Sequence, residues 1–559
     1  MENKPRENRA DDLPANATEF IRQVVREMRY RRKARRDVEM ELTAHFEDEL
    51  RDCPDPQERQ KRAQRLVEQF GDVQLLAVLC RRAKKRCRPL WASAVVRTGQ
   101  GLGVLLLLFV LYTVWFVAGR PRPTVDYVAL LNQMGRPQIV ARDNAWPHYE
   151  KAIALLVGPD EELRSMEAFA RRGRPDYPGF AALPEKARRA IAQWVQENEA
   201  AWQEFRTASL RPYCQRPYAC DPNAKEPWML NVQMPPLAPI RDVARVGIWR
   251  SRLALEHGDV SRALDDCLTV ARAAPHWQTR GTLIEQLVGI ALSRLAHEEI
   301  LALVHERVLA PVQLAELQRK ISALYPDRYP SIDMESERLV LLDTIQRVFT
   351  NSGPGGGHLA PLAAKSLAVT GHDDFPEDLT GPWLTALGMI HAGRDDTVAK
   401  VEQIFELQAK CAKLTPYERY TADRMGADRI LDSLPKYRYA LIHSLAPALD
   451  RAADLAFQGR GLHEATLTIL ALHRYRAEKG RYPVSLGELQ RAGYLEVLPV
   501  DPYRNGSLVY HVTNDDFTLY SLSRNFQDNG GRPALDRKGR RQKWADGGAG
   551  PVVLPIAFS

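Results

Sequence analysis

The chain has 559 residues, with 45% hydrophobic residues, 26% charged residues and a formal net charge of +8. This length exceeds what one hydrophobic core serves, and the composition is that of folded protein, so a single domain, a collagen-like repeat and wholesale disorder are excluded. Residues 1–97 hold 23 Lys/Arg against 17 Asp/Glu, which accounts for six of the eight net charges. The basic balance is therefore local and does not indicate nucleic-acid binding by the whole chain.

The first residues, 1–16, are predicted to be disordered, and helices follow them. Asn16-Ala-Thr-Glu19 has the form of a capping box, which predicts that a first helix begins there. Asp55-Pro56 is typical of a helix start, and Gly71-Asp72 predicts the end of one helix and the cap of the next. Apolar residues at helical spacing mark the inner faces of these helices: Phe20, Ile21, Val24, Val38, Leu42, Phe46, Leu50, Ala63, Leu66, Val73 and Leu76.

This layout, with ELTAHFEDEL at 41–50 and LVEQFGD at 66–72, resembles the permease-prefix or HAAS domain, a small helical domain that precedes membrane spans in many bacterial proteins. The resemblance implies a cytoplasmic helical prefix domain over 17–90. It also implies regulatory contact with a cytoplasmic protein partner and no catalysis.

Two basic runs lie within this domain, at 29–36 and 84–86. They are compatible with a solvated helix face, an anionic membrane surface or nucleic-acid phosphates. Because a bilayer must lie close by, lipid headgroups are the simpler ligand, and nucleic acid is the least favoured of the three. The predicted membrane-surface residues are Arg31, Arg32, Lys33, Arg35, Arg36, Lys84, Lys85 and Arg86.

Residues 98–118 form an uncharged, largely apolar run, TGQGLGVLLLLFVLYTVWFVA. At ~1.5 Å per residue, about 21 residues cross the ~30 Å hydrocarbon layer, so this run predicts one transmembrane helix. A signal peptide is disfavoured because almost 100 residues precede it. Seven Lys/Arg precede the span between Arg81 and Arg97, and only Arg120 and Arg122 follow closely. This asymmetry predicts a cytoplasmic N-terminus, a single pass through the cytoplasmic membrane, and residues 120–559 on the extracytoplasmic side.

The next part, 120–240, is predicted to be helical, most clearly at 145–156 and 186–205, with a bend at 171–178. Its last portion is a proline-rich connector that holds Cys214 and Cys220. These two cysteines either pair, as an oxidising compartment permits, or remain free thiols. No CxxC or CxxH spacing among the seven cysteines suggests a zinc site.

Residues 241–350 contain RVGIWRSRLALEHGDVSRALDDCLTVARAAP at 245–275, which resembles a tetratricopeptide repeat. In this reading, Gly258-Asp259 forms the turn and Pro275 ends the second helix. Further helices are expected at 280–306 and 311–324. The resemblance implies an α-solenoid-like helical body of the kind that binds peptides or proteins.

A glycine-rich segment, 351–382, is predicted to be a flexible loop, followed by a helical region at 383–460. Ser352 to His358 lacks the Lys-Ser/Thr of a phosphate-binding loop. The His-Glu pairs at 297, 305 and 463 lack the HExxH spacing of a zinc protease, so these histidines are expected to be satisfied or solvent-facing. No catalytic residues are assigned.

The last predicted domain spans 461–531, in which a helix ends at Gly480 and strands occupy 508–512 and 517–522. The phrases GRYP, PVDP and YSL resemble the globular α+β module of the major pseudopilin of type II secretion. That family's module binds calcium in its final loop, which implies Asp528 as a calcium ligand here. The pseudopilin N-terminal helix and cleavage site do not precede this module, and residues 532–559 are expected to be a tail.

The predicted fold is therefore mainly α: a small cytoplasmic helical domain, one transmembrane helix, a solenoid-like body and a small α+β module. The expected function is that of a membrane-anchored scaffold or binding protein, with membrane lipid and an envelope protein as partners and no cofactor except calcium. Two alternatives remain open, an envelope hydrolase with a dispersed active site and a transmembrane signalling protein.

Overall fold

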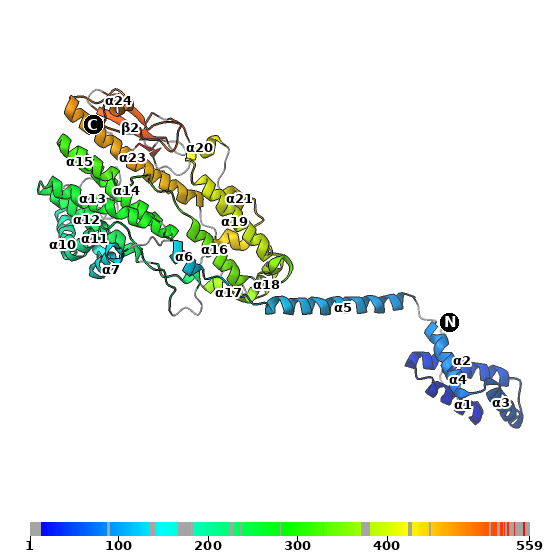
Figure 1. Cartoon of the computed structure of the whole chain (residues 1–559). Coiled ribbons are helices and arrows are strands. Elements are labelled where there is room, and N and C mark those ends of the chain that lie inside the picture. The colour runs from blue at the N-terminus through cyan, green and yellow to red at the C-terminus, as the bar shows by residue number, and fades with distance from the viewer. Residues whose placement is uncertain are drawn as a thin grey trace. The chain divides into compact units, whose positions relative to one another are not determined.

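The protein is mainly helical and divides into two compact units, Met1–Trp115 and Phe116–Ser559 (Figure 1). A computed structural model describes residues 13–86, 90–134, 140–165, 180, 183–222, 228–234, 236–279, 281–327, 329–369, 381–422, 427–445, 449–513, 516–522, 526–528, 530, 531, 534, 535, 541, 542, 552 and 553.

The N-terminal unit begins with four helices around one apolar core. Phe20 lies at its centre, with ring centroids 6.2 Å from Phe46 and 5.8 Å from Phe70. Asp55 caps the third helix by accepting a hydrogen bond from the Glu58 amide at 3.3 Å. The helices are α1 Ala15–Glu27, α2 Arg32–Leu50, α3 Pro56–Phe70 and α4 Val73–Arg86.

The start of α1 differs from the predicted capping box. The helix begins at Ala15, after Pro14, and no side chain caps it. Glu19 instead receives hydrogen bonds from Arg22 and Gln23 on its own helix face. Because proline fixes φ near its helical value, Pro14 brings the chain into the helix before Asn16 can act as the cap. The capping-box prediction is therefore wrong at this helix, whereas the predicted Gly71-Asp72 junction is confirmed: Gly71 has φ 72° and Asp72 accepts from the Gln74 amide at 2.9 Å.

The helix α5, Leu90–Ala118, is long and apolar enough to cross a membrane. Its apolar part, Ala94–Ala118, has 25 residues, and the most apolar 18-residue stretch within it has a mean hydropathy of 2.4 and is only 6% buried in the protein. A helix that is apolar on every side and that the described part of the chain leaves almost entirely uncovered has the character of a membrane span.

The first half of the C-terminal unit is a helical array whose core follows α12, α13 and α14, which pack in succession. Gly258 has φ 78°, and Asp259 caps α13 through the Arg262 amide at 3.0 Å, as the turn prediction requires. The helices are α6 Tyr127–Met134, η2 Ala141–Asp143, α7 Trp146–Leu155, α8 Glu161–Ser165, α10 Glu185–Glu197, α11 Glu199–Ser209, η3 Met229–Asn231, α12 Leu237–Glu256, α13 Val260–Gln278, α14 Leu283–Glu306 and α15 Pro311–Ser322. The predicted bend at 171–178 lies outside the described residues.

The single helix predicted over 186–205 is two helices that meet at Asn198. This residue is fully buried, and its side chain accepts from the Val157 amide at 2.8 Å and donates to the Val157 carbonyl at 3.0 Å. Asn198 thus satisfies the backbone of a distant segment. Periodicity along 186–205 gives no sign of this junction, because the partner lies 41 residues away.

The prediction that Pro275 ends a helix is also wrong, since α13 continues to Gln278 with Pro275 inside it. The last turn is held by tertiary contacts: His276 lies 2.8 Å from the Tyr149 hydroxyl and 2.9 Å from the Arg211 carbonyl oxygen. Trp277 is buried in the same core. These contacts offset the hydrogen bond that proline removes from a helix interior.

The second half of the C-terminal unit surrounds a 31-residue helix, α23, which contacts α14, α15, α21 and α24 (Figure 1). Gly480, with φ 76°, follows it immediately, as predicted. The helices are α16 Glu335–Val348, η4 Pro354–Gly356, α17 Pro361–Val369, α18 Gly381–Ile390, α19 Arg394–Cys411, α20 Pro416–Thr421, α21 Ala427–Ser433, α22 Ala440–Leu445, α23 Leu449–Lys479 and α24 Leu486–Arg491.

A small sheet follows α24, with the order β1-β2-β5. The antiparallel pair β1 Val509–Thr513 and β2 Asp516–Ser521 lies within a residue of the predicted strands, in register Val509↔Tyr520. The strand β5, Val552–Val553, adds to β2 from a segment that was predicted to be a tail. A separate pair, β3 Ala534–Leu535 and β4 Arg541–Gln542, lies between them in sequence.

The glycine-rich loop, predicted to be flexible, holds the end of α5 within the C-terminal unit. The His358 ring stacks on Phe116 with centroids 4.1 Å apart, and its Nε2 lies 2.9 Å from the Phe116 carbonyl oxygen. Asn351 exchanges two hydrogen bonds with the backbone of Arg122, at 2.7 and 3.0 Å. The loop is thus a docking element for the chain that leaves α5. Residues 370–380 lie outside the described part.

Candidate functional site

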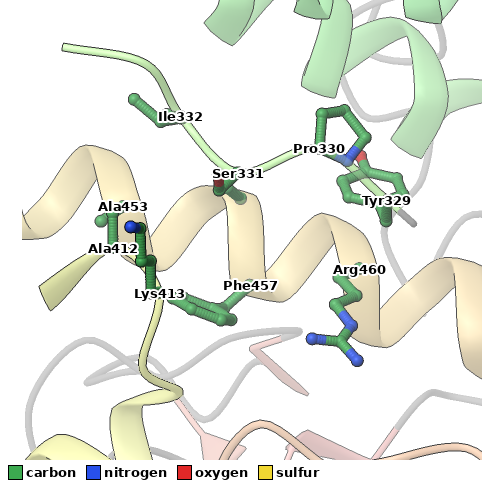
Figure 2. Close-up of a pocket in the computed structure, with 10 residues that line it drawn as sticks. Tyr329, Pro330, Ser331, Ile332, Ala412, Lys413, Ala453, Phe457 and Arg460 are labelled. Carbon is green, nitrogen blue, oxygen red and sulfur yellow. The ribbon is translucent and has the colours of Figure 1, made fainter. Parts of the chain in front are cut away.

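A pocket opens between α23, the segment 329–332 and the chain that leaves α19 (Figure 2). Its volume is about 120 Å³. Pockets that enclose a whole small molecule commonly measure ~300–1,000 Å³, so this one suits a single side chain or a terminal group. From α23 come Ala453, Ala456, Phe457 and Arg460, from the extended segment Tyr329, Pro330, Ser331 and Ile332, and from beyond α19 Ala412 and Lys413.

The pocket combines an apolar wall with positive charge. Lys413 lies next to Phe457, and Arg460 follows one turn further along α23 (Figure 2). Arg419 is not among the lining residues; it lies 5.8 Å from the centre of the Phe457 ring and pairs with Asp454 at 3.0 Å. None of the ten lining residues is an acid or a histidine. This arrangement favours an anionic group attached to an apolar stem.

Tyr329, which forms one wall of the pocket, is held by residues on its side away from the pocket. Gln278 of α13 donates to its hydroxyl at 2.8 Å. Gly459 of α23 lies directly beneath it: an added Cβ there would come within 2.5 Å of the Tyr329 hydroxyl and 3.4 Å of Ile290. The absence of a side chain at Gly459 therefore allows Tyr329 to close this side of the pocket.

Replacing Gly459 by alanine is expected to lower the free energy of unfolding by about 1–3 kcal/mol, because the new methyl group must displace the buried tyrosine. The measurement is denaturant unfolding of the full-length protein in detergent, followed by circular dichroism. Gly487, in α24, is the matched control, since its added Cβ would meet nothing nearer than 3.8 Å. If G459A is as stable as G487A, Tyr329 is not held in this way.

Behind Tyr329 lies a buried pair of histidines. His297 Nε2 on α14 lies 3.0 Å from His463 Nδ1 on α23, and His297 Nδ1 lies 2.6 Å from the Ser293 carbonyl oxygen. The rings of Tyr325 and Tyr329 lie 5.0 and 5.8 Å from that of His463. The two imidazoles thus join α14, α23 and the segment that forms the pocket wall.

Both histidines are held neutral. Their side chains are 1% and 5% exposed. Burial lowers the pKa of His297 to about 4, and burial followed by the nearby His297 lowers the pKa of His463 well below its usual value. In a neutral pair, one of the two facing nitrogens donates its N–H to the other. The second nitrogen of each ring can then form a hydrogen bond with another neighbour. The pair therefore acts as a polar junction between helices, sealed from solvent.

The spacing of the histidines along the chain predicts that each is satisfied or solvent-facing, and it links none of them to another. The structure satisfies both but pairs them across 166 residues of sequence. No local spacing could have revealed this contact, because α14 and α23 meet only through the packing of the unit. The pocket residues Lys413 and Arg460 carry no motif and were likewise not anticipated.

The predicted membrane-surface cations occupy the N-terminal unit. Arg31 precedes α2, and most of the first run lies exposed or half-buried on that helix. Lys85 is exposed on α4, whereas Lys84 donates to Glu41 at 2.5 Å and helps to join α4 to α2. Arg86 ends α4.

Asp528, the predicted calcium ligand, accepts hydrogen bonds from the Gly530 amide at 2.9 Å and the Tyr520 hydroxyl at 2.8 Å. These two bonds, the backbone one first, lower the pKa of the Asp528 carboxyl. Within the described part of the chain, no group of three or more His, Cys, Asp or Glu side chains could hold a metal ion. Both Cys214 and Cys220 are free thiols.

A second buried carboxylate, Asp501, lies in the turn that sequence reasoning compared with the pseudopilin PVDP phrase. Its oxygens accept from the Ser521 hydroxyl at 2.6 Å and from the amides of Tyr503 and Leu522 at 2.9 and 2.8 Å. Burial raises the pKa of this carboxyl. Asp501 therefore fastens the turn to the end of β2, which is a structural role.

Comparisons of the chain with protein-family models, with curated proteins and with solved structures give no match.

Proposed function

We propose that the protein is a single-pass, membrane-anchored binding protein whose helical C-terminal unit holds an extracytoplasmic protein partner. The observation that carries this proposal is the pocket of α23, which joins an apolar wall to the cations Lys413 and Arg460 and contains no acid or histidine. Cations beside an apolar wall suit the binding of an anionic group that has an apolar stem. The pocket's size and charge fit an Asp or Glu side chain, or a terminal carboxylate, of the partner.

The anchor in this proposal is α5, with the N-terminal unit in the cytoplasm and the C-terminal unit in the envelope. Its support is the length and apolar character of α5 and the excess of Lys/Arg before it. The N-terminal helices would then contact the membrane surface through Arg31, Arg32 and Lys85, and a cytoplasmic protein through their remaining faces.

The finer architecture belongs to the same proposal. The helix pairs α12–α13 and α14–α15 are the proposed solenoid-like, tetratricopeptide-like body, and their support is the successive packing of α12, α13 and α14. The end of α23, α24 and the strands β1 and β2 are the proposed pseudopilin-like module. Calcium at Asp528 remains part of the proposal, as an aid to recognition by that module.

The test is co-purification of the full-length protein from membranes, with quantitative mass spectrometry of what it retains, in calcium and in chelator. Lys413→Glu is expected to reduce the proposed partner at least about tenfold, because truncating or reversing a charge that pairs across an interface costs ~2 kcal/mol or more. Lys410→Glu is the matched control, since it makes the same charge change on the exposed face of α19, where Lys410 pairs with Glu406.

Each outcome separates the competing functions. If K413E retains the partner as well as the wild type does, the pocket is not the binding site. Loss of the partner in chelator alone would show that the contact needs calcium and would favour Asp528 as a ligand. If the protein retains no partner and hydrolyses members of a broad substrate panel, the envelope-hydrolase alternative replaces the binding function. A specific soluble partner of the N-terminal unit would favour the signalling alternative.

A further inference from the structure

The helices α17 and α18 pack against each other and form a hairpin with an unusual surface. No residue of α18 is charged. Leu384 and Gly388 of α18 face the protein, whereas Trp383, Ala386 and Ile390 face outward at helical spacing. Trp383 is 68% exposed and Ile390 55% exposed. A surface helix normally presents polar residues to water, so an apolar outer face indicates a surface that contacts another protein or a membrane.

The position of α18 is fixed by the end of α5. A Cβ placed on Gly388 would lie 3.1 Å from two ring atoms of Phe116, so the two helices meet at this glycine without an intervening side chain. Phe116 is 2% exposed and lies two residues before the end of α5. The contact of α18 is therefore with the last turn of the membrane helix.

The length of α5 sets the depth of that contact. Its uncharged run, residues 98–118, has 21 residues, which at ~1.5 Å per residue matches the ~30 Å hydrocarbon layer. A residue two positions from its end therefore lies where hydrocarbon gives way to headgroups. Gly388 of α18, which contacts Phe116, is then close to this level.

We propose that the outer face of the α17–α18 hairpin, formed by Trp383, Ala386, Ile390 and Leu362, lies in the interfacial layer of the bilayer that α5 crosses. This inference rests on the proposed membrane span and adds a second, non-spanning membrane contact on the far side. The C-terminal unit is then seated on the lipid surface through this hairpin.

The chemistry of the surrounding residues favours lipid as the occupant. Trp383 is an amphipathic aromatic of the type that gathers at headgroup level. Three exposed cations belong to these segments: Lys365 lies on α17, and Arg120 and Arg122 follow the end of α5. Phosphates of the lipid headgroups can pair with them. Leu362, on α17, is 67% exposed and extends the apolar face to the second helix.

The experiment uses the full-length protein in liposomes of phosphatidylcholine and phosphatidylglycerol, with a benzophenone amino acid at one position at a time. We expect irradiation to attach lipid at 383 and 390, with a yield on the order of tenfold above that at Val484. Val484 is the matched control, because it is an apolar residue of the same unit and is 74% exposed. Attachment of lipid at position 107, in the middle of α5, tests whether α5 spans the bilayer.

The outcomes distinguish this inference from the function on which it rests. Lipid at 107, 383 and 390 supports both. Lipid at 107 but not at 383 or 390 overturns the hairpin contact and leaves the span intact. The absence of lipid at 107 overturns the membrane anchor. Attachment of 383 or 390 to a second protein chain instead of lipid shows that protein covers this face, which also overturns the inference.

Discussion

Acidification from pH 6.5 to pH 4 is expected to remove much of the stability of the C-terminal unit, because several of its histidines are buried in the neutral form. Burial lowers the pKa of His276, His297 and His473 to about 4 in each case. The unfolded chain binds a proton on each of these side chains below about pH 6.5, whereas the folded chain does not until about pH 4.

The sign follows from this difference. In the window from 6.5 to 4 the unfolded state holds more protons, so the free energy of unfolding falls as the pH falls, by about 3 kcal/mol for each histidine. His463, whose pKa is lowered still further, acts in the same direction. Asp266, Asp501 and Glu337 oppose the trend, because burial raises the pKa of each carboxyl, that of Asp266 to about 6. The buried histidines with a lowered pKa, which also include His391, outnumber them, and the net effect is loss of stability in acid.

The measurement is denaturant unfolding of the full-length protein at half-unit intervals between pH 7.5 and 4. His297→Gln is expected to flatten the pH dependence by at least about 3 kcal/mol over this window, because its own titration is removed and the pKa of His463, which His297 lowers, moves back toward its usual value. His257→Gln is the control, since His257 is exposed at the end of α12. Equal slopes for the wild type and H297Q would contradict the prediction.

Replacing Trp202 by alanine is expected to lower the free energy of unfolding by about 3–5 kcal/mol. Trp202 is fully buried on α11, and its ring stacks on Phe205 with centroids 5.6 Å apart. Its far end covers Gly247 of α12, where an added Cβ would overlap the ring. The indole therefore fills the space that the glycine leaves, and its removal creates a cavity between two core helices.

The glycine supplies a matched test of this packing. Gly247→Ala alone is expected to cost about 1–3 kcal/mol, because the rigid indole cannot move aside. Trp202→Phe removes the outer part of the ring, so the double variant W202F/G247A should be more stable than the sum of the two single changes predicts. Leu210→Ala, at an exposed site after α11, should change stability by less than ~0.5 kcal/mol. Additive single effects would show that the two residues do not share one space.

The features that could be predicted from the sequence are those that local chemistry decides. The apolar run of α5 needs no partner within the chain, because its length and composition suit a bilayer. Gly71 and Gly480 end their helices because each takes a positive φ, which glycine adopts without steric cost. The pair β1 and β2 follows from alternating residues on either side of a short turn.

The errors arose where distant residues compete with local preference. Asn198 interrupts a helical pattern because it satisfies the backbone of Val157, and Pro275 remains inside a helix because His276 and Trp277 are anchored in the core. The glycine-rich loop has the composition of a flexible connection, yet it holds Phe116 and Arg122. In each case the deciding partner is far away in sequence.

The sequence by itself thus determined the helical class, the membrane-type helix and the ends of several elements, because these depend on propensity, periodicity and backbone freedom within a few residues. Only the tertiary structure decided the histidine pair of α14 and α23, the cationic pocket and the contact of α18 with the end of α5. In each of these three features, side chains from segments far apart in sequence come into contact only when the helices pack. The spacing of residues along the chain therefore does not predict these contacts.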